Sequence, residues 1–68
     1  MTVSIKLFGA MYRMPQESLR EAMDAFCKEL STEGHDVTWE HESDIPGGYM
    51  VSLFVNGEKK VAGLVIHE

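Results

Sequence analysis

The residues of this chain that could ligate a metal ion are three histidines, one cysteine and a few carboxylates. The set consists of Cys27, His35, His41 and His67, with Glu42 and Asp44 as oxygen donors. Zinc sites in proteins usually draw such ligands from short, recurring spacings along the chain. The intervals between these residues match none of those spacings. We therefore expect no metal ion and no other cofactor.

Cys27 is also the one candidate for a cysteine nucleophile. A reactive cysteine needs a basic neighbour or a helix N-terminus to lower the pKa of its thiol. Phe26 and Leu30 accompany Cys27 on the same predicted helical face, so its surroundings are apolar. The sequence contains no glycine-rich phosphate loop, no G-x-S-x-G, no H-E-x-x-H and no C-x-x-C. We expect no catalytic residues, and we predict that the chain is not an enzyme.

Length and charge narrow the class of protein further. The 68 residues are enough for one domain, 1–68, and 44% of them are apolar, which is typical of a folded chain. The net charge of −5 argues against direct nucleic-acid binding, which requires clustered lysine and arginine. No apolar run approaches the roughly 18 residues of a membrane span, and no secretory signal pattern is present. We expect a cytoplasmic protein that binds no membrane.

The segment from Pro15 to Glu33 has the one strong helical period in the chain. Its apolar residues recur at three- and four-residue intervals: Leu19, Ala22, Met23, Phe26, Cys27 and Leu30. Pro15 suits a first helical position, and we favour a start there. The alternative is a start after Ser18, which forms a capping-box pattern with Glu21. Gly34 is a suitable residue to follow the helix.

Alternating apolar and polar residues predict four strands around this helix. The predicted strands are Thr2–Phe8, Asp36–Glu42, Tyr49–Val55 and Lys59–His67, with a loop at 9–14 and a turn at 43–48. The resulting order is β-α-β-β-β. We predict an α+β fold of two layers, in which the helix packs on one face of a four-stranded mixed sheet that ends in an antiparallel meander. Trp39 is expected to anchor the core against Phe26 and Leu30, and the alternative is that it is a hot spot for binding a partner.

The register of the last hairpin decides which apolar residues reach the open face. Asn56-Gly57 predicts a two-residue turn, which would pair Leu53 with Lys60. The outward-facing apolar residues are then Met50, Phe54, Val61 and Val65. A three-residue loop would instead turn the last strand over. Exposed apolar area of this kind often marks a contact surface, so we expect a partner to bind there.

A second candidate contact surface is acidic. Glu40, Glu42 and Asp44 lie on or just after the predicted second strand. Such a cluster can dock on a basic surface of another protein, including one that normally holds nucleic acid. We therefore include these three residues among those expected to contact a partner.

The segment from Val3 to Ala10 resembles the first strand of small ubiquitin-like sulfur carriers. Those carriers have a second strand before their helix and end in Gly-Gly. This chain is predicted to enter its helix directly, and its last residues are Ile66-His67-Glu68. We therefore do not assign it to that family.

Together these features predict a small, acidic, non-enzymatic domain that acts by binding another protein. A regulator or inhibitor encoded by a phage or mobile element would fit this size and charge. One alternative is a homodimeric accessory protein that associates through the open face of the sheet. Another alternative is an acidic mimic of nucleic acid.

Overall fold

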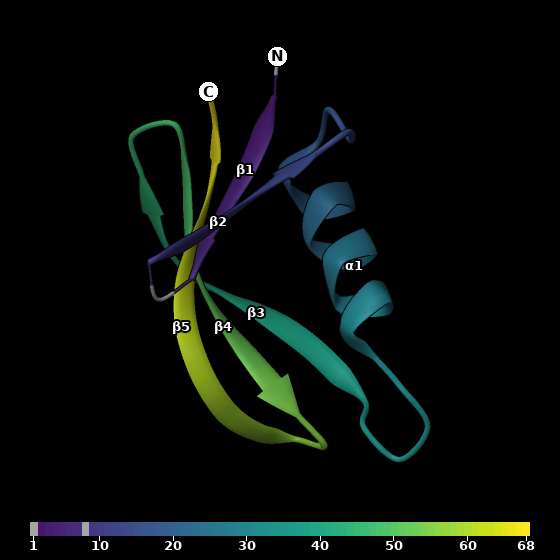
Figure 1. Ribbon diagram of the computed structural model, residues 1–68. Coiled ribbons are helices and arrows are strands. Elements are labelled where there is room, and N and C mark those ends of the chain that lie inside the picture. The colour runs from purple at the N-terminus through teal and green to yellow at the C-terminus, as the bar shows by residue number, and fades with distance from the viewer. Residues whose placement is uncertain (1, 8) are drawn as a thin grey trace.

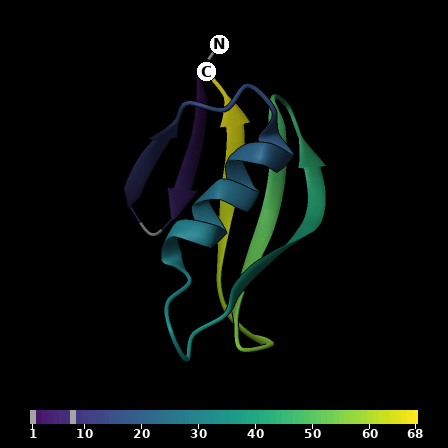
Figure 2. The same cartoon turned by 90° about the vertical axis from the view of Figure 1, so that its right-hand side faces the viewer.

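In the described part of the chain, one helix crosses one face of a twisted five-stranded antiparallel sheet (Figures 1 and 2). The computed structural model describes residues 2–7 and 9–68. The elements are β1 Val3–Leu7, β2 Ala10–Met14, α1 Leu19–Leu30, β3 Val37–Ile45, β4 Gly48–Val55 and β5 Glu58–His67. The strand order is β2-β1-β5-β4-β3. The predicted two-layer α+β fold is confirmed, but the sheet has five strands rather than four and is antiparallel rather than mixed.

The additional strand, β2, forms where the sequence predicted a loop. Gly9 takes a φ of 76°, and the chain then returns antiparallel to β1. Tyr12 of β2 packs against Phe26 of α1, with ring centroids 5.1 Å apart, and Met14 is buried. The predicted end of the first strand, Phe8, lies outside the described residues. The second strand whose expected absence separated this chain from the sulfur carriers is therefore present.

The helix is shorter at both ends than we predicted. Ser18 is its N-cap, and the Ser18 hydroxyl oxygen accepts a hydrogen bond from the amide of Glu21 at 3.4 Å. The capping-box alternative is therefore correct and the favoured start at Pro15 is wrong. At the other end, the amide of Ser31 donates to the carbonyl of Cys27 at 2.9 Å. The Ser31 hydroxyl donates to the same carbonyl at 2.8 Å, so the helix ends before Glu33.

The core lies between the helix and the sheet. Its buried apolar residues are Val3, Ile5, Met14, Ala22, Met23, Phe26, Cys27, Val51, Leu53 and Val65. The four helical members of this set all belong to the face that the sequence predicted. At the far edge of the sheet, Trp39 of β3 faces the helix and is partly buried against the core, rather than being one of its fully buried residues. Its indole N–H donates to the Asp24 carboxylate at 2.8 Å, and the Arg20 guanidinium lies 5.8 Å from its ring.

The strand β3 continues further than predicted. A bulge between His41 and Ser43 interrupts its register with β4, after which pairing resumes as far as Ile45. The predicted turn at 43–48 is therefore confined to Pro46 and Gly47, where Gly47 has a φ of 86°. The bulge absorbs the extra residue, so the turn-forming sequence does not end the strand early.

The hairpin turn at Asn56-Gly57 is confirmed. Both residues have positive φ, 51° and 82°, as a two-residue type I′ turn requires. The Asn56 side chain also holds the loop between α1 and β3. Its Oδ1 accepts from the amide of Asp36 at 2.8 Å, and its Nδ2 donates to the carbonyl of Gly34 at 3.0 Å.

Candidate functional site

The register of the β4–β5 hairpin differs from the prediction two residues beyond its turn. Phe54 pairs with Lys59 as expected, but a bulge follows and Leu53 pairs with Val61 instead of Lys60. A one-residue shift turns every later side chain of β5 to the opposite face. The predicted faces of this strand are therefore wrong beyond the bulge, because an extra residue is accommodated within the strand rather than in the turn.

This shift changes the membership of the predicted contact surface. Val65 is fully buried on the helix side, and Val61 packs against the core, so neither belongs to the open face. Met50 remains outward and is 42% exposed, and Phe54 shares its face. The apolar residues of β5 that replace the two valines on the open face are Ala62, Leu64 and Ile66. Because Ser52 and Met50 pair directly with Ala62 and Leu64, these side chains lie side by side.

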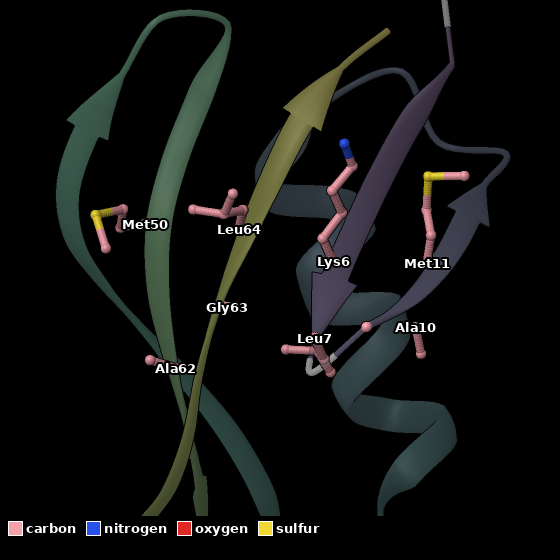
Figure 3. A pocket seen from close by; sticks show the side chains of 9 residues that line it. Lys6, Leu7, Ala10, Met11, Met50, Ala62, Gly63 and Leu64 are labelled. Carbon is pink, nitrogen blue, oxygen red and sulfur yellow. The ribbon is translucent and has the colours of Figure 1, made fainter.

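The open face contains a groove of about 460 Å³ between β1–β2 and β4–β5 (Figure 3). One wall is formed by Met50, Ala62 and Leu64. Leu7, Ala10 and Met11 contribute to the other wall. Met11 is 48% exposed, so a large thioether side chain lies open to solvent on each side of the groove. The lining is mainly apolar, which is the surface character of a contact site.

Lys6 is the one charged residue among those that line this groove. It lies between Met11 of β2 and Leu64 of β5 in the sheet, and pairs with both in the strand register. Its ammonium is 3.8 Å from the Glu68 carboxylate, a separation typical of a weak, exposed ion pair. A lysine stem covers apolar surface while its charge remains solvated, so Lys6 adds a cation to the groove without closing it.

The groove lies beside the end of the described pairing between β1 and β5. The described pairing of the two strands runs from Val3 with His67 to Lys6 with Leu64. At this point the backbone of β1 passes close to Gly63. A Cβ placed on Gly63 would overlap the side chain of Leu7 and lie 2.7 Å from the carbonyl oxygen of Lys6. Glycine therefore permits a close approach of β1 to β5 at this point.

The predicted acidic surface lies on the edge strand β3. Glu40 is exposed on the open face, and Glu42 is the residue at the bulge. Asp44 is on the helix side instead, where its carboxylate contacts the His41 imidazole at 2.8 Å. Charged side chains and bulges are common devices that prevent an edge strand from pairing with another chain. Protection of the edge strand therefore explains the acidic cluster, and the explanation does not require a partner to bind there.

The structure does not bring the remaining candidate ligands together. Among residues 2–7 and 9–68, no group of three or more histidine, cysteine or acidic side chains is placed to hold a metal ion. Within the same residues, no helix has both the length and the apolar character needed to cross a membrane.

Cys27 is buried in the core, and its environment opposes ionisation. Burial, with a smaller contribution from the nearby Asp24 carboxylate, raises the pKa of the Cys27 thiol to about 11. A thiol with a raised pKa holds very little thiolate near neutral pH, and the thiolate is the reactive form. This environment agrees with the prediction, made from the helical pattern, that Cys27 is an unreactive residue of the core.

The raised pKa of Cys27 predicts a loss of stability in alkali. Below about pH 9 the thiol is protonated in both states, so it adds no pH dependence. Between about pH 9 and 11 the unfolded chain ionises first, and the free energy of unfolding should fall by about 2–3 kcal/mol. Urea denaturation of the wild type and of Cys27→Ala across this range measures the difference in slope. Parallel pH profiles for the two proteins would contradict the assignment.

Comparisons with known proteins give no relative for this chain. No family model matches it, and neither the curated proteins nor the solved structures contain a significant match. The function must therefore be argued from the groove and its surroundings.

Proposed function

We propose that this chain is a non-enzymatic binding domain whose open-face groove receives an apolar part of another protein. The observation that carries this proposal is the pair Met11 and Met50, two large, exposed apolar side chains on opposite walls of one groove. Methionine is flexible and polarisable, and surfaces that bind varied apolar side chains often use it. Burial of both side chains would supply a favourable hydrophobic contribution to binding.

The groove is favoured over the acidic edge as the contact surface. The acidic residues of β3 have a structural explanation, since charge and a bulge protect an edge strand. Exposed apolar side chains around a groove have no comparable role in a free monomer, and they increase the tendency to associate. The acidic edge and the net charge of −5 would instead influence how fast a charged partner approaches.

A homodimer would use the same groove, and the mass of the protein in solution distinguishes a homodimer from a monomer that binds a different protein. Light scattering over a concentration series should give the mass of a monomer if the groove serves a different protein. A dimer that dissociates on substitution of Met50 would show that the groove binds a second copy. That result would replace the proposed partner with self-association.

Met50→Asp should weaken binding of a partner by about tenfold or more. The substitution places a carboxylate on the groove wall, where binding would have to desolvate it. The measurement is the dissociation constant for proteins recovered on the immobilised wild type. Lys28→Glu is the matched control: it makes the chain more acidic at an exposed helical position away from the groove, and it should bind as the wild type does. Equal binding by Met50→Asp and the wild type would overturn the proposal.

We also propose that the protein works in the cytoplasm. Its single cysteine is a buried free thiol, which suits a reducing compartment. Fractionation of cells that express a tagged chain tests this location, and recovery in a secreted fraction would contradict it.

A further inference from the structure

The helix covers only part of the sheet face on which it packs. α1 has 12 residues and is about 18 Å long, whereas the 10 residues of β5 extend over roughly 33 Å. Figure 2 shows β4 and β5 continuing beyond the C-terminal end of α1. The side chains at that end of the sheet therefore receive less cover from the helix than those beneath it.

The burial of valine residues on this face shows the difference in cover. Val65 lies in the core and is fully buried. Val61 pairs with the buried Leu53, and Val55 lies two residues beyond Leu53 on the same side of β4, opposite Val37. Val37, Val55 and Val61 are all only partly buried. The sheet therefore presents a half-covered aliphatic surface near the point where the helix ends.

These three valines line a pocket of about 440 Å³ on the helix side of the sheet. Its lining also includes Leu30, the last residue of α1, and Tyr12 of β2. Both of these large side chains are 45% exposed, so apolar surface at the pocket is in contact with water. Sites for small molecules have this size and character, since they are mainly apolar and contain a few polar groups.

The polar groups of this pocket favour an anion. Lys60, at the bulge of β5, contributes to the lining together with Thr32 and His35 from the segment after α1. None of the described lining residues is acidic, although the whole chain has 11 acidic and 6 basic residues. The Lys60 ammonium lies 3.4 Å from the Glu58 carboxylate, but this ion pair is exposed to solvent and therefore weak. A carboxylate of a ligand can share or replace this contact.

We propose that the pocket binds a small aliphatic carboxylate, whose hydrocarbon chain lies against Leu30 and the three valines and whose carboxylate pairs with Lys60. Burial of the hydrocarbon chain and of these side chains supplies the affinity. The ion pair fixes the orientation of the ligand. The pocket is on the helix side of the sheet, so this site is separate from the open-face groove and does not depend on the proposed partner.

The first test maps the binding of octanoate on the full chain. Backbone amide signals of isotope-labelled protein are recorded during a titration with octanoate, and a parallel titration uses octanol, which has the same chain length and no charge. Saturable shifts should appear at Leu30, Val55, Lys60 and Val61, and the signal of Met50 in the groove should not change. Lack of saturable shifts, or saturable shifts confined to the groove, would overturn the proposal.

Leu30→Gln tests the apolar part of the site. The new amide would lose contact with water when the hydrocarbon chain binds, so octanoate and octanol should both bind about fivefold more weakly. Leu30 is already 45% exposed, so the variant should keep its fold. Met11→Gln makes the same change in the groove, at a side chain that is 48% exposed, and both ligands should bind it as they bind the wild type. Equal affinities of Leu30→Gln and the wild type would contradict the placement of the hydrocarbon chain.

Lys60→Gln tests the ion pair separately. It should weaken binding of octanoate by about threefold, the effect of a solvent-exposed ion pair, and leave binding of octanol unchanged. Lys59→Gln removes the same charge at the adjacent residue, which is not among the described residues that line the pocket, and it should change neither affinity. Equal affinities of octanoate for Lys60→Gln and the wild type would overturn the assignment of a carboxylate ligand.

Discussion

Met23→Ala is expected to lower the free energy of unfolding by about 2–5 kcal/mol, the range for truncation of a buried large apolar residue to alanine. Met23 is fully buried between the helix and the sheet. Its loss removes apolar contacts and leaves a cavity that the surrounding strands can fill in part. A domain of this length has a total stability of roughly 3–10 kcal/mol, so the variant should be close to unfolding at room temperature.

A second methionine provides the matched control for this prediction. Met50 is 42% exposed, and Met50→Ala should change stability by no more than about 0.5 kcal/mol. Urea denaturation followed by circular dichroism measures both variants against the wild type. Similar losses for the two substitutions would contradict the assignment of Met23 to the core and of Met50 to the open face.

Gly63→Ala should also be strongly destabilising, by about 3 kcal/mol, because of steric overlap rather than backbone strain. The added methyl group would overlap the side chain of Leu7 and lie 2.7 Å from the carbonyl oxygen of Lys6. The Leu7 side chain can rotate away, but the carbonyl belongs to the backbone of a paired strand. The end of β1 must therefore move, and the groove should change shape with it.

A double-mutant cycle tests this explanation. Leu7→Ala removes one of the two overlaps, so Gly63→Ala should cost less in that background than in the wild type. Thermal unfolding of the four proteins gives the coupling between the two sites. Strictly additive losses would show that Gly63 and Leu7 do not meet as described.

The helix was the part of the fold that the sequence predicted best. Its apolar period is strong, and Ala22, Met23, Phe26 and Cys27 are all buried as expected. Its start was ambiguous because Pro15 and Ser18 both carry N-terminal signals. The side chain of Ser18 resolves this ambiguity, since its oxygen accepts the amide hydrogen bond of Glu21, whereas Met14, the cap of a helix that begins at Pro15, has no side-chain oxygen.

The strand β2 was missed because Met11, on its outer face, breaks the alternation of apolar and polar residues. Tyr12 and Met14 face the helix, whereas Met11 faces the groove, so three large apolar residues fall within four positions. Such a segment lacks the clear alternation of a strand with one solvated face. Gly9, in the turn between the two strands, was the signal that could have indicated a hairpin.

The register of β5 could not be deduced for a similar reason. Alternate residues of the last strand, Ala62, Leu64 and Ile66 against Val61 and Val65, make two plausible apolar faces. A bulge selects between them, and a bulge leaves little trace in a sequence. The absence of a side chain at Gly63 is the feature that decides the packing, because β1 crosses there.

The sequence therefore predicted some residues of the candidate site and missed others. Met50 and Phe54 lie on the open face as predicted, because they share a face with Ser52, the polar residue that lies between them in β4. Met11 and Leu64 were missed, since one belongs to the unpredicted strand and the other to the shifted one. The groove itself is lined by strands that are far apart in the sequence, so it could not be predicted from local patterns.

The most direct test of the proposed binding surface is a map of backbone amide signals of isotope-labelled protein, recorded with and without a bound partner. We expect the largest changes at Lys6, Met11, Ala62 and Leu64, which surround the groove. Changes confined to the acidic edge at Glu40 and Glu42, with the groove unaffected, would contradict the account.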